Sequence, residues 1–442
     1  MSSLPQETNG WFRFNQFLAE SASIKLVVIG FIILLMLIPL TLMKDLMYER
    51  NNRHQSAIEE VSATWGGSQT ITGLFITIPF FEKAPATTGN AVVLPVKSQA
   101  TFLPDDLKIE AKIELGERMR GIYKVPIYTT KVTIEGAFLH PDFSDLKEVG
   151  QVNWEEAQVH LGLSDLRGLE DLMVLTWGDT VLTMSPGVKS DLVQEGVSSR
   201  IPLSEAPATE KIRFKIDFSF RGSQGIFFMP LGRETTVHLS GNWEHPSFQG
   251  AFLPASHHEK NGSFTADWKV LYLNRNYPQA FTGYPNSFDE SRFGMSVYIP
   301  ISDYQKNQRA AKYAVLIIAL TFMVFFFVQI LNKVRIHGIQ FILVGLALCL
   351  FYVMLLSFTE HIGFNGAYLL STAMTVGLVS LYISAIFKNR RLSLLNCLFM
   401  IFVYLFVFVI IQLEHYALLV GSIGLFIVLA VAMYLSRNIT WG

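Results

Sequence analysis

The last third of the chain carries five long apolar runs that are separated by very short polar breaks. Each run has about 20 residues, enough for a helix to cross a hydrocarbon layer of about 30 Å. Peptide groups find no water inside a bilayer, so such runs fold as helices. The runs cover residues 313–331, 338–358, 364–387, 392–413 and 416–435. Residues 312–442 are therefore predicted to form a five-helix transmembrane block.

An apolar run near the start of the chain predicts a sixth membrane helix. It covers residues 24–43, and residues 1–23 before it, with aromatic and polar residues side by side, predict a cytoplasmic interfacial segment. A cleaved signal peptide has a shorter apolar region and a small-residue cleavage site, whereas Lys44 and Asp45 follow this run directly. We interpret the run as a retained signal-anchor helix.

Basic residues beside the runs predict how the chain is oriented. Lys or Arg follows the second, fourth and sixth runs, and neither occurs in the other two breaks of the block. The positive-inside rule places the basic breaks in the cytoplasm. Six crossings then put both termini in the cytoplasm of a multi-pass inner-membrane protein, with residues 44–311 on the periplasmic side.

Residues 44–311 are the only segment large enough for a globular core, and their pattern predicts β-strands. In residues 211–221 apolar and polar side chains alternate strictly, as in a strand with one buried face. The apolar set is Ile212, Phe214, Ile216, Phe218 and Phe220. Residues 108–115, 131–138, 263–272 and 294–299 alternate in the same way. We predict a β-rich domain of antiparallel, sandwich-like sheets, and hence an α+β membrane protein with six transmembrane helices.

Signatures of catalysis and of metal binding are missing from the sequence. No phosphate-binding loop, zinc-protease motif, nucleophile elbow or dinucleotide-binding glycine pattern occurs. Residues 164–168 are better explained by an Asp165–Arg167 pair that clamps a turn than by a nucleophile with its base. Residues 257–259, two histidines and a glutamate, are interpreted as a solvent-exposed loop. We therefore predict no enzyme and no cofactor, and the net charge of −1 gives no reason to expect nucleic acid.

Two Glu-His pairs form the first candidate site. Glu360-His361 follows the third membrane run and Glu414-His415 follows the fifth, so both are expected at the outer interface. Histidine changes its charge near physiological pH, which would make a shared site sensitive to pH. The simpler interpretation is that polar residues mark the ends of two helices.

Two further sets of residues are candidates for contacts with other molecules or between domains. The first stands at the outer end of the second membrane run and would couple the β domain to the membrane. It consists of Arg309, Lys312 and Tyr313. The second would form an aromatic ledge, or alternatively part of the core. It consists of Trp243, His245, Phe248 and Phe252.

Three runs of the sequence resemble the CreD family of bacterial inner-membrane proteins. They are residues 242–254 (NWEHPSFQGAFLP), 309–327 (RAAKYAVLIIALTFMVFFF) and 337–364 (HGIQFILVGLALCLFYVMLLSFTEHIGF). Weaker resemblance at 73–79, at 163–168 and in the first membrane run extends it over nearly the whole chain. The resemblance implies a role in cell-envelope integrity and in a two-component envelope-stress response. It implies no catalytic residue, cofactor or substrate.

Three hypotheses about function remain. We favour a non-enzymatic protein that supports envelope integrity, whose periplasmic domain binds an envelope protein, lipid or glycan. The alternative is a lipid or small-molecule translocation factor built from the helices. Ion-coupled transport is disfavoured, because carriers of that kind place a charged group near the middle of a span and these spans have none there. A periplasmic hydrolase of unrecognised type is the third hypothesis.

Overall fold

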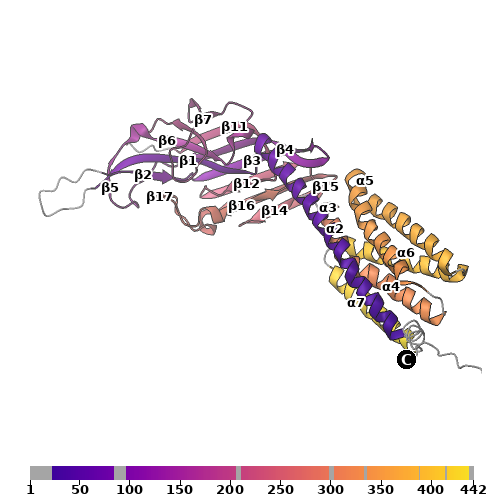
Figure 1. Ribbon diagram of the computed structural model, residues 1–442. Helices are drawn as coiled ribbons and strands as arrows, with labels where there is room; N and C mark the ends of the chain where they lie inside the picture. The colour runs from indigo at the N-terminus through magenta and orange to yellow at the C-terminus, as the bar shows by residue number, and fades with distance from the viewer. Residues whose placement is uncertain are drawn as a thin grey trace, which may run out of the picture. The chain divides into compact units, whose positions relative to one another are not determined.

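The chain consists of a helical part and a large part made of β-sheets (Figure 1). The computed structural model describes residues 22–83, 96–205, 211–297, 303–332, 336–387, 389–413 and 416–437. Two compact units are present: a helical unit, Met1–His54 and Ile301–Gly442, and a β unit, Gln55–Pro300. Helix α2, Ala22–Trp65, begins in the helical unit and ends in the β unit. The α+β class is thus confirmed.

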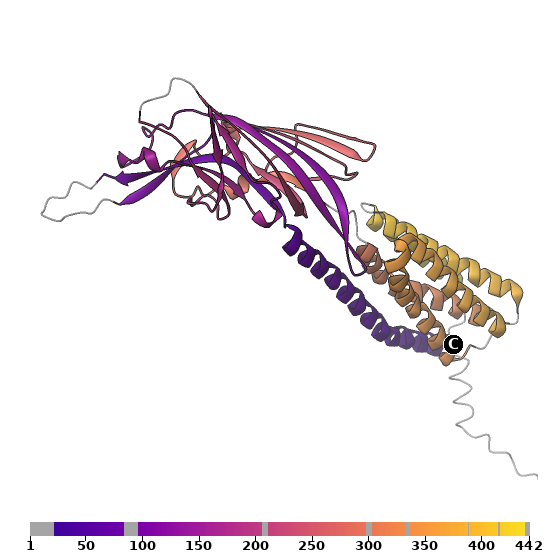
Figure 2. The same cartoon turned by 90° about the horizontal axis from the view of Figure 1, so that it is seen from above.

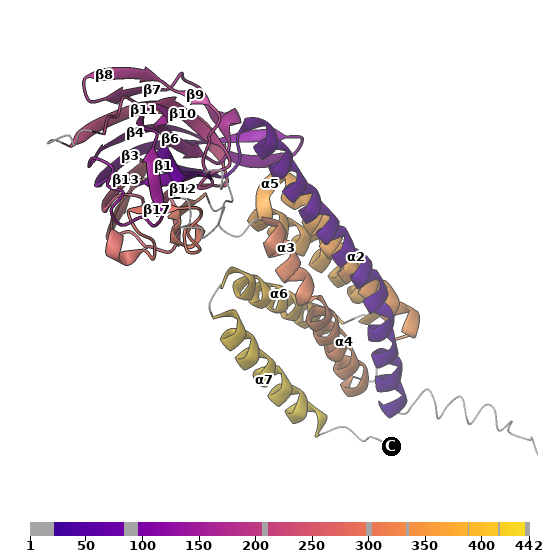
Figure 3. The ribbon, with the colours of Figure 1, turned by 90° about the vertical axis from the view of Figure 1, so that its left-hand side faces the viewer.

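The β unit contains two sheets within the described residues. The ten-stranded sheet follows the order β14 (Ser247–Gly250), β18 (Phe293–Ser296), β12 (Gly225–Met229), β1 (Gln69–Glu82), β6 (Gln158–Leu163), β10 (Gly196–Arg200) and β9 (Ser185–Pro186), with β2 (Lys97–Phe102), β5 (Val149–Val152) and β17 (Ala280–Thr282) attached at its side. The eight-stranded sheet follows the order β15 (Ser256–Lys260), β16 (Ser263–Leu271), β13 (Glu234–Gly241), β3 (Asp106–Arg120), β4 (Tyr123–Phe138), β11 (Ile212–Ser223), β7 (Val174–Trp177) and β8 (Thr180–Thr183). Figure 3 shows six neighbouring strands of the eight-stranded sheet side by side, in the order β8, β7, β11, β4, β3 and β13.

Strand β11 confirms the alternation that the sequence shows at residues 211–221. Its inward side chains Phe214, Ile216 and Phe218 are 4 % exposed or less, whereas Lys215 and Asp217 face solvent. The other four predicted strands correspond to β3, β4, β16 and β18. Strand β16 ends at Leu271, because a short 3₁₀ turn begins at the next residue. In β3, β4, β11 and β16 a period of two marks the face that lies in the core. Strand β18 is buried without alternation, and residues 298 and 299 of the predicted strand lie outside the described residues.

Strands β15 and β16 form a hairpin with a tight turn at Asn261 and Gly262. Asn261 and Gly262 lie between the two strands with φ angles of 53° and 74°. A tight hairpin turn of this kind needs positive φ at both central residues, and Asn-Gly is the sequence that provides it most readily.

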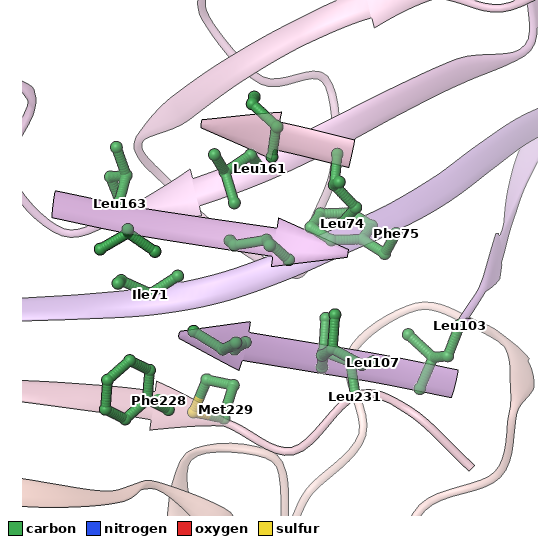
Figure 4. Packing of buried hydrophobic residues seen from close by; sticks show 14 of the residues in the cluster. Ile71, Leu74, Phe75, Leu103, Leu107, Leu161, Leu163, Phe228, Met229 and Leu231 are labelled. Carbon is green, nitrogen blue, oxygen red and sulfur yellow. The ribbon is translucent and has the colours of Figure 1, made fainter. Parts of the chain in front are cut away.

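A single hydrophobic core joins the two sheets of the β unit. Ile71 of β1 and Phe228 of β12 come from the ten-stranded sheet, and Leu107 of β3 comes from the eight-stranded one. All three are 1 % exposed or less, and Figure 4 shows them close together. Burying one side chain of this size stabilises the fold by about 1.5–3 kcal/mol, so the shared core fixes the two sheets to each other.

Two strand pairs differ from the antiparallel arrangement expected from the sequence. Strand β1 pairs in parallel with β12, and β3 pairs in parallel with β13, while the other pairings are antiparallel. Both parallel pairs join strands that are far apart in the chain. The alternation of side chains is the same in both directions, so the sequence pattern could not show this.

The helical unit contains five further helices among the described residues. They are α3 (Asp303–Lys312), α4 (Ala314–Leu331), α5 (Gly338–Phe387), α6 (Arg390–Gln412) and α7 (Ala417–Ser436). Figure 2 shows the helices of the orange-to-yellow part of the chain lying side by side. Four helices, α2, α5, α6 and α7, are long and apolar enough to cross a membrane, and α3 with α4, bent by 42°, gives a fifth candidate. The predicted number of six crossings stays a prediction.

Helix α5 is a hairpin of two helices rather than one rod. Gly363 interrupts it with φ 71° and ψ 166°. In one straight helix Phe351 and Tyr368 would lie about 25 Å apart. Their ring centroids are 5.4 Å apart, so the chain folds back at Gly363. The five-residue break expected at 359–363 is therefore wrong in its length: the turn needs only one non-helical residue.

The core of the helical unit joins α2 to the helices of the last third. Ile29, Ile32, Met36 and Leu40 recur at intervals of three or four residues in α2, and each is 5 % exposed or less. They belong to one buried cluster with residues of α4, α5 and α6. A helix that packs through one face shows this spacing.

Candidate functional site

Glu360, from the first predicted Glu-His pair, lies in a polar cluster next to the turn at Gly363. Its Oε1 is 3.7 Å from Nη1 of Arg50 in α2, and the Glu360 side chain is 13 % exposed. The separation is that of an ion pair and is too long for a hydrogen bond. Oε1 of Glu360 has no hydrogen-bond partner within the described residues.

Helices α2 and α3 supply the other members of this cluster. The ring of His54, one turn after Arg50 in α2, stacks on Tyr304 of α3 at 5.3 Å between centroids. Residues four apart in a helix share a face, so Arg50 and His54 lie together. Thr359 of α5 donates a hydrogen bond of 3.3 Å to Oδ1 of Asn307, which is fully buried. We call Arg50, His54, Tyr304, Asn307 and Glu360 the turn cluster.

Of the two Glu-His pairs that were predicted to share a site, the structure describes only the first, Glu360-His361. Glu360 is half-buried in the turn cluster, whereas His361 is exposed. Glu414 and His415 lie outside the described residues. A shared site of both pairs stays a prediction. Sequence reasoning missed Arg50 and His54, although their four-residue spacing beyond the first apolar run was a usable signal.

The three residues proposed to couple the β domain to the membrane lie where α3 meets α4. Tyr313 stands between the two helices, with φ −87° and ψ 1°, and packs against the helical core. Arg309 is half-buried and Lys312 is exposed. The bend of 42° between α3 and α4 was not predicted from the apolar run. The coupling role of Arg309, Lys312 and Tyr313 stays a prediction.

The residues of the expected aromatic ledge lie at the margin of the β core. Phe248 makes ring contacts with Phe264 and Trp268 at 6.3 and 5.6 Å between centroids. Phe252 packs on Phe293 at 5.8 Å. These contacts favour the alternative given above, in which the aromatic residues extend the core.

The remaining two residues of this set differ in exposure. The indole N–H of Trp243 donates a hydrogen bond of 3.1 Å to the carbonyl of His245. Trp243 is half-buried against the core and His245 is exposed. Of the four residues of the expected ledge, only His245 is exposed. The role of the ledge as a docking surface stays a prediction.

The Asp165–Arg167 pair is a structural clamp, as predicted. Arg167 donates two hydrogen bonds of 2.9 Å to the carboxylate and a third of 2.6 Å to the carbonyl of Ala63. Burial raises the pKa of Asp165, but hydrogen bonds from Arg167 and from the Gly67 N–H outweigh it and hold the pKa below its ordinary value. The hydroxyl of Ser164 donates to the carbonyl of Ser68 at 2.8 Å. It is therefore held by the backbone and is not arranged as a nucleophile.

Residues 257–259 form part of a strand instead of the expected loop. Strand β15, Ser256–Lys260, is exposed along its whole length. Adjacent side chains of a strand point to opposite faces, so His257 and His258 cannot share one metal ion easily. No group of three metal-ligating side chains occurs within the described residues.

The solvent face of the eight-stranded sheet carries a polar depression that sequence reasoning did not single out. Its volume is about 490 Å³, and Lys112, Lys131, His238 and Asp217 are among its lining residues. His238 is bound through Nδ1 to Asp267 at 2.6 Å. This hydrogen bond lowers the pKa of Asp267 from its ordinary value. The depression offers charged groups of both signs on a rigid sheet.

Two lysines lie next to each other in the lining of this depression. Lys112 of β3 is directly opposite Lys131 of β4 in the register of the sheet. Lys108 and Lys215 on the same face have carboxylate partners, Glu110 and Glu135, at 2.6 Å. Like charges directly opposite each other destabilise a sheet. A ligand with hydrogen-bond acceptors or negative charge would relieve this repulsion.

Comparisons with known proteins give one family and one curated relative. A family model described as "CreD: Inner membrane protein CreD" matches residues 21–442. The protein named "Inner membrane protein CreD" from Escherichia coli (strain K12) is 30 % identical over 418 residues, which are 92 % of this chain and 91 % of the relative. A mutant of the M1 zinc metallopeptidase from Deinococcus radiodurans has a TM-score of 0.21 at 10 % identity over 38 % of each chain. This last likeness is too small to support any argument.

Proposed function

The chain belongs to the CreD family of inner membrane proteins, and on this premise we propose that it is a non-enzymatic protein that supports cell-envelope integrity. In this proposal the β unit lies in the periplasm and binds an envelope component. The helical unit holds it in the inner membrane. A role in the response to envelope stress follows from the same proposal.

Six membrane crossings are part of the proposal. The two halves of α5 are each about as long as a bilayer is thick, so a hairpin at Gly363 accounts for two crossings. Helix α2, the bent pair α3 and α4, α6 and α7 account for the other four. Basic residues follow the even-numbered crossings, which favours cytoplasmic termini.

The observation that carries the binding function is the polar depression on the eight-stranded sheet. Its lining combines lysine, acidic and hydroxyl side chains, which suit a polar envelope component such as a glycan or a headgroup. The side chains stand on strands whose other face is fixed in the core, so they are held in place before a ligand binds. We infer that Lys112 and Lys131 are its principal contacts.

The hydrolase hypothesis finds little support, because the hydroxyl–histidine pair formed by Thr77 and His160 is fully buried in the β core, out of reach of a substrate. The hydroxyl of Ser164 is held by backbone groups at 2.8 and 2.9 Å. The two adjacent histidines stand on an exposed strand. The alternative function, translocation of a lipid or small molecule through the helices, is favoured by one observation: polar side chains are buried inside the helical unit, among them Asn307 and Asn396.

Photo-crosslinking in living cells tests the proposed binding. A photoreactive amino acid replaces Ser240, which lines the depression, or Val181, which is 70 % exposed on strand β8 of the same sheet. We expect a discrete adduct with an envelope lipid, glycan or protein only from position 240, and we expect the double variant Lys112→Ser, Lys131→Ser to lose it. Equal adducts at both positions, or an adduct unaffected by the double variant, would refute a binding role for the depression.

A further inference from the structure

The helical unit contains buried polar side chains between the two halves of α5 and α6. Asn396 and Ser371 are 0 % exposed, and Thr375, Tyr352 and Tyr404 are each 1 % exposed. We call these five residues the polar seam. None of them carries a charge at neutral pH, so the seam is distinct in chemistry from the turn cluster.

Aromatic contacts bring one end of the seam together. The ring of Phe351 lies 4.9 Å from that of Tyr352 and 4.8 Å from that of Tyr404. Tyr368, in the second half of α5, donates its hydroxyl to the carbonyl of Tyr404 at 2.8 Å. Three helical segments, the two halves of α5 and α6, therefore meet at this level.

The other end of the seam is reached by following the two neighbouring helices away from this contact. Asn396 and Tyr404 are two turns apart on one face of α6, and Thr375 is two turns from Tyr368 on α5. At 1.5 Å per residue, these steps correspond to about 12 Å and about 10 Å. The second half of α5 ends at Phe387 and α6 begins at Arg390, so the two run in opposite directions. Thr375 and Asn396 thus lie at matching depth.

The polar atoms of the seam need partners from outside the protein. Both amide atoms of Asn396, the hydroxyls of Ser371 and Thr375, and the phenol oxygens of Tyr352 and Tyr404 have no hydrogen-bond partner among the residues described. Leaving such groups unpaired is costly in a protein interior, and a surrounding bilayer supplies no water to them. Hydroxyl and amide groups both donate and accept, and water is the small molecule that matches both roles.

We propose that the polar seam is an internal hydrated site, in which water molecules bridge the hydroxyl and amide groups of α5 and α6. The site goes beyond the proposed function, which concerns the β unit, and either can fail without the other. In this proposal the helical unit holds water between the two halves of α5 and α6. Only neutral side chains form the site, so it holds no side-chain charge that would balance the charge of an ion.

Radiolytic footprinting tests the site, because hydroxyl radicals formed from bound water oxidise the side chains next to it. Met400 lies one turn from both Asn396 and Tyr404 and is 1 % exposed. The matched control is Met36 of α2, which is 3 % exposed and packs on Gly345 and the apolar core. Met119 of the β unit, 60 % exposed, reports the dose. In the full chain in nanodiscs of phosphatidylethanolamine and phosphatidylglycerol, we expect Met400 to be oxidised several-fold faster than Met36.

Two variants complete the test. Asn396→Leu removes both orphaned amide atoms, and Thr375→Val removes one hydroxyl with almost no change in shape, so at least one variant is expected to fold. Each should lower the oxidation rate of Met400 towards that of Met36 while Met119 is unchanged. Equal rates for Met400 and Met36 in the unaltered chain would overturn the proposal. So would a Met400 rate that neither variant changes.

Discussion

His160 shows, at the scale of one residue, how the β core controls a titratable group. It lies in β6 with 0 % exposure, and its Nε2 shares a hydrogen bond of 2.7 Å with the hydroxyl of Thr77. The ring of Phe75 is 5.2 Å away between centroids. Burial penalises the charged imidazolium and lowers the pKa of His160 to about 4.

This lowered pKa predicts that acid destabilises the β unit. Between the ordinary histidine pKa of 6.5 and the folded value of about 4, the unfolded chain binds a proton that the native chain does not. The stability is fully present above pH 6.5 and falls as the pH drops towards 4, by up to about 3 kcal/mol. His160→Gln should flatten this dependence. Urea unfolding followed by tryptophan fluorescence at several pH values measures it.

The control for this prediction is a histidine that the solvent already surrounds. His258→Gln, on the exposed strand β15, should leave the pH dependence as it is in the unaltered chain. A dependence that His160→Gln leaves unchanged between pH 4 and 6.5 would show that burial of His160 is not its source.

At the scale of single elements, the hairpin of α5 depends on one glycine. Gly363 has φ 71° and ψ 166°, a backbone conformation that is almost exclusive to glycine. Gly377, in the second half of the same helix, has nothing within 4 Å of the place where a Cβ would stand. The two glycines therefore have opposite structural roles within one element.

Alanine substitutions should separate these two roles. Gly363→Ala forces a side chain into the strained turn, at a cost of about 1–3 kcal/mol. Gly377→Ala removes backbone freedom from a helix and should be neutral or stabilise by about 0.5–1 kcal/mol. Thermal unfolding of the full chain in lipid nanodiscs gives the melting midpoint of the helical unit for each variant. We expect the midpoint to fall for Gly363→Ala and to stay unchanged or rise for Gly377→Ala. An equal drop for both variants would contradict the special role of Gly363.

The same elements show what could be predicted from the sequence. Strand β11 was predicted correctly, because its buried face follows from local alternation. The turn at Asn261 and Gly262 likewise has a local cause, the turn chemistry of Asn-Gly. The parallel pairing of β1 with β12 depends on where distant strands meet, which alternation does not encode. For the same reason Glu360 could be singled out as a candidate, but its pairing with Arg50, from a helix near the other end of the chain, could not be predicted.

At the scale of the whole molecule, the two units differ in where their charged and neutral polar residues lie. Charged residues lie on the solvent face of the eight-stranded sheet, where the depression with Lys112 and Lys131 is found on its central strands β3 and β4. The helical unit buries neutral polar groups in its seam and keeps its ion pair, Arg50 with Glu360, next to the turn in α5. This division fits the proposal that an inner membrane protein binds a polar partner through its sheets.

The central claim is that the β unit faces the periplasm while the break between α5 and α6 faces the cytoplasm, and thiol labelling tests it most directly. Both native cysteines, Cys349 and Cys397, are first replaced by alanine, since the sequence has no others. Single cysteines are then placed at Leu172, 88 % exposed in the β unit, or at Arg390, exposed at the start of α6.

A membrane-impermeant maleimide is added to cells whose outer membrane alone has been permeabilised. The account predicts that the thiol at position 172 reacts at once and that the thiol at position 390 reacts only after the inner membrane is disrupted. Labelling of position 390 in intact inner membranes, or protection of position 172 there, would contradict it.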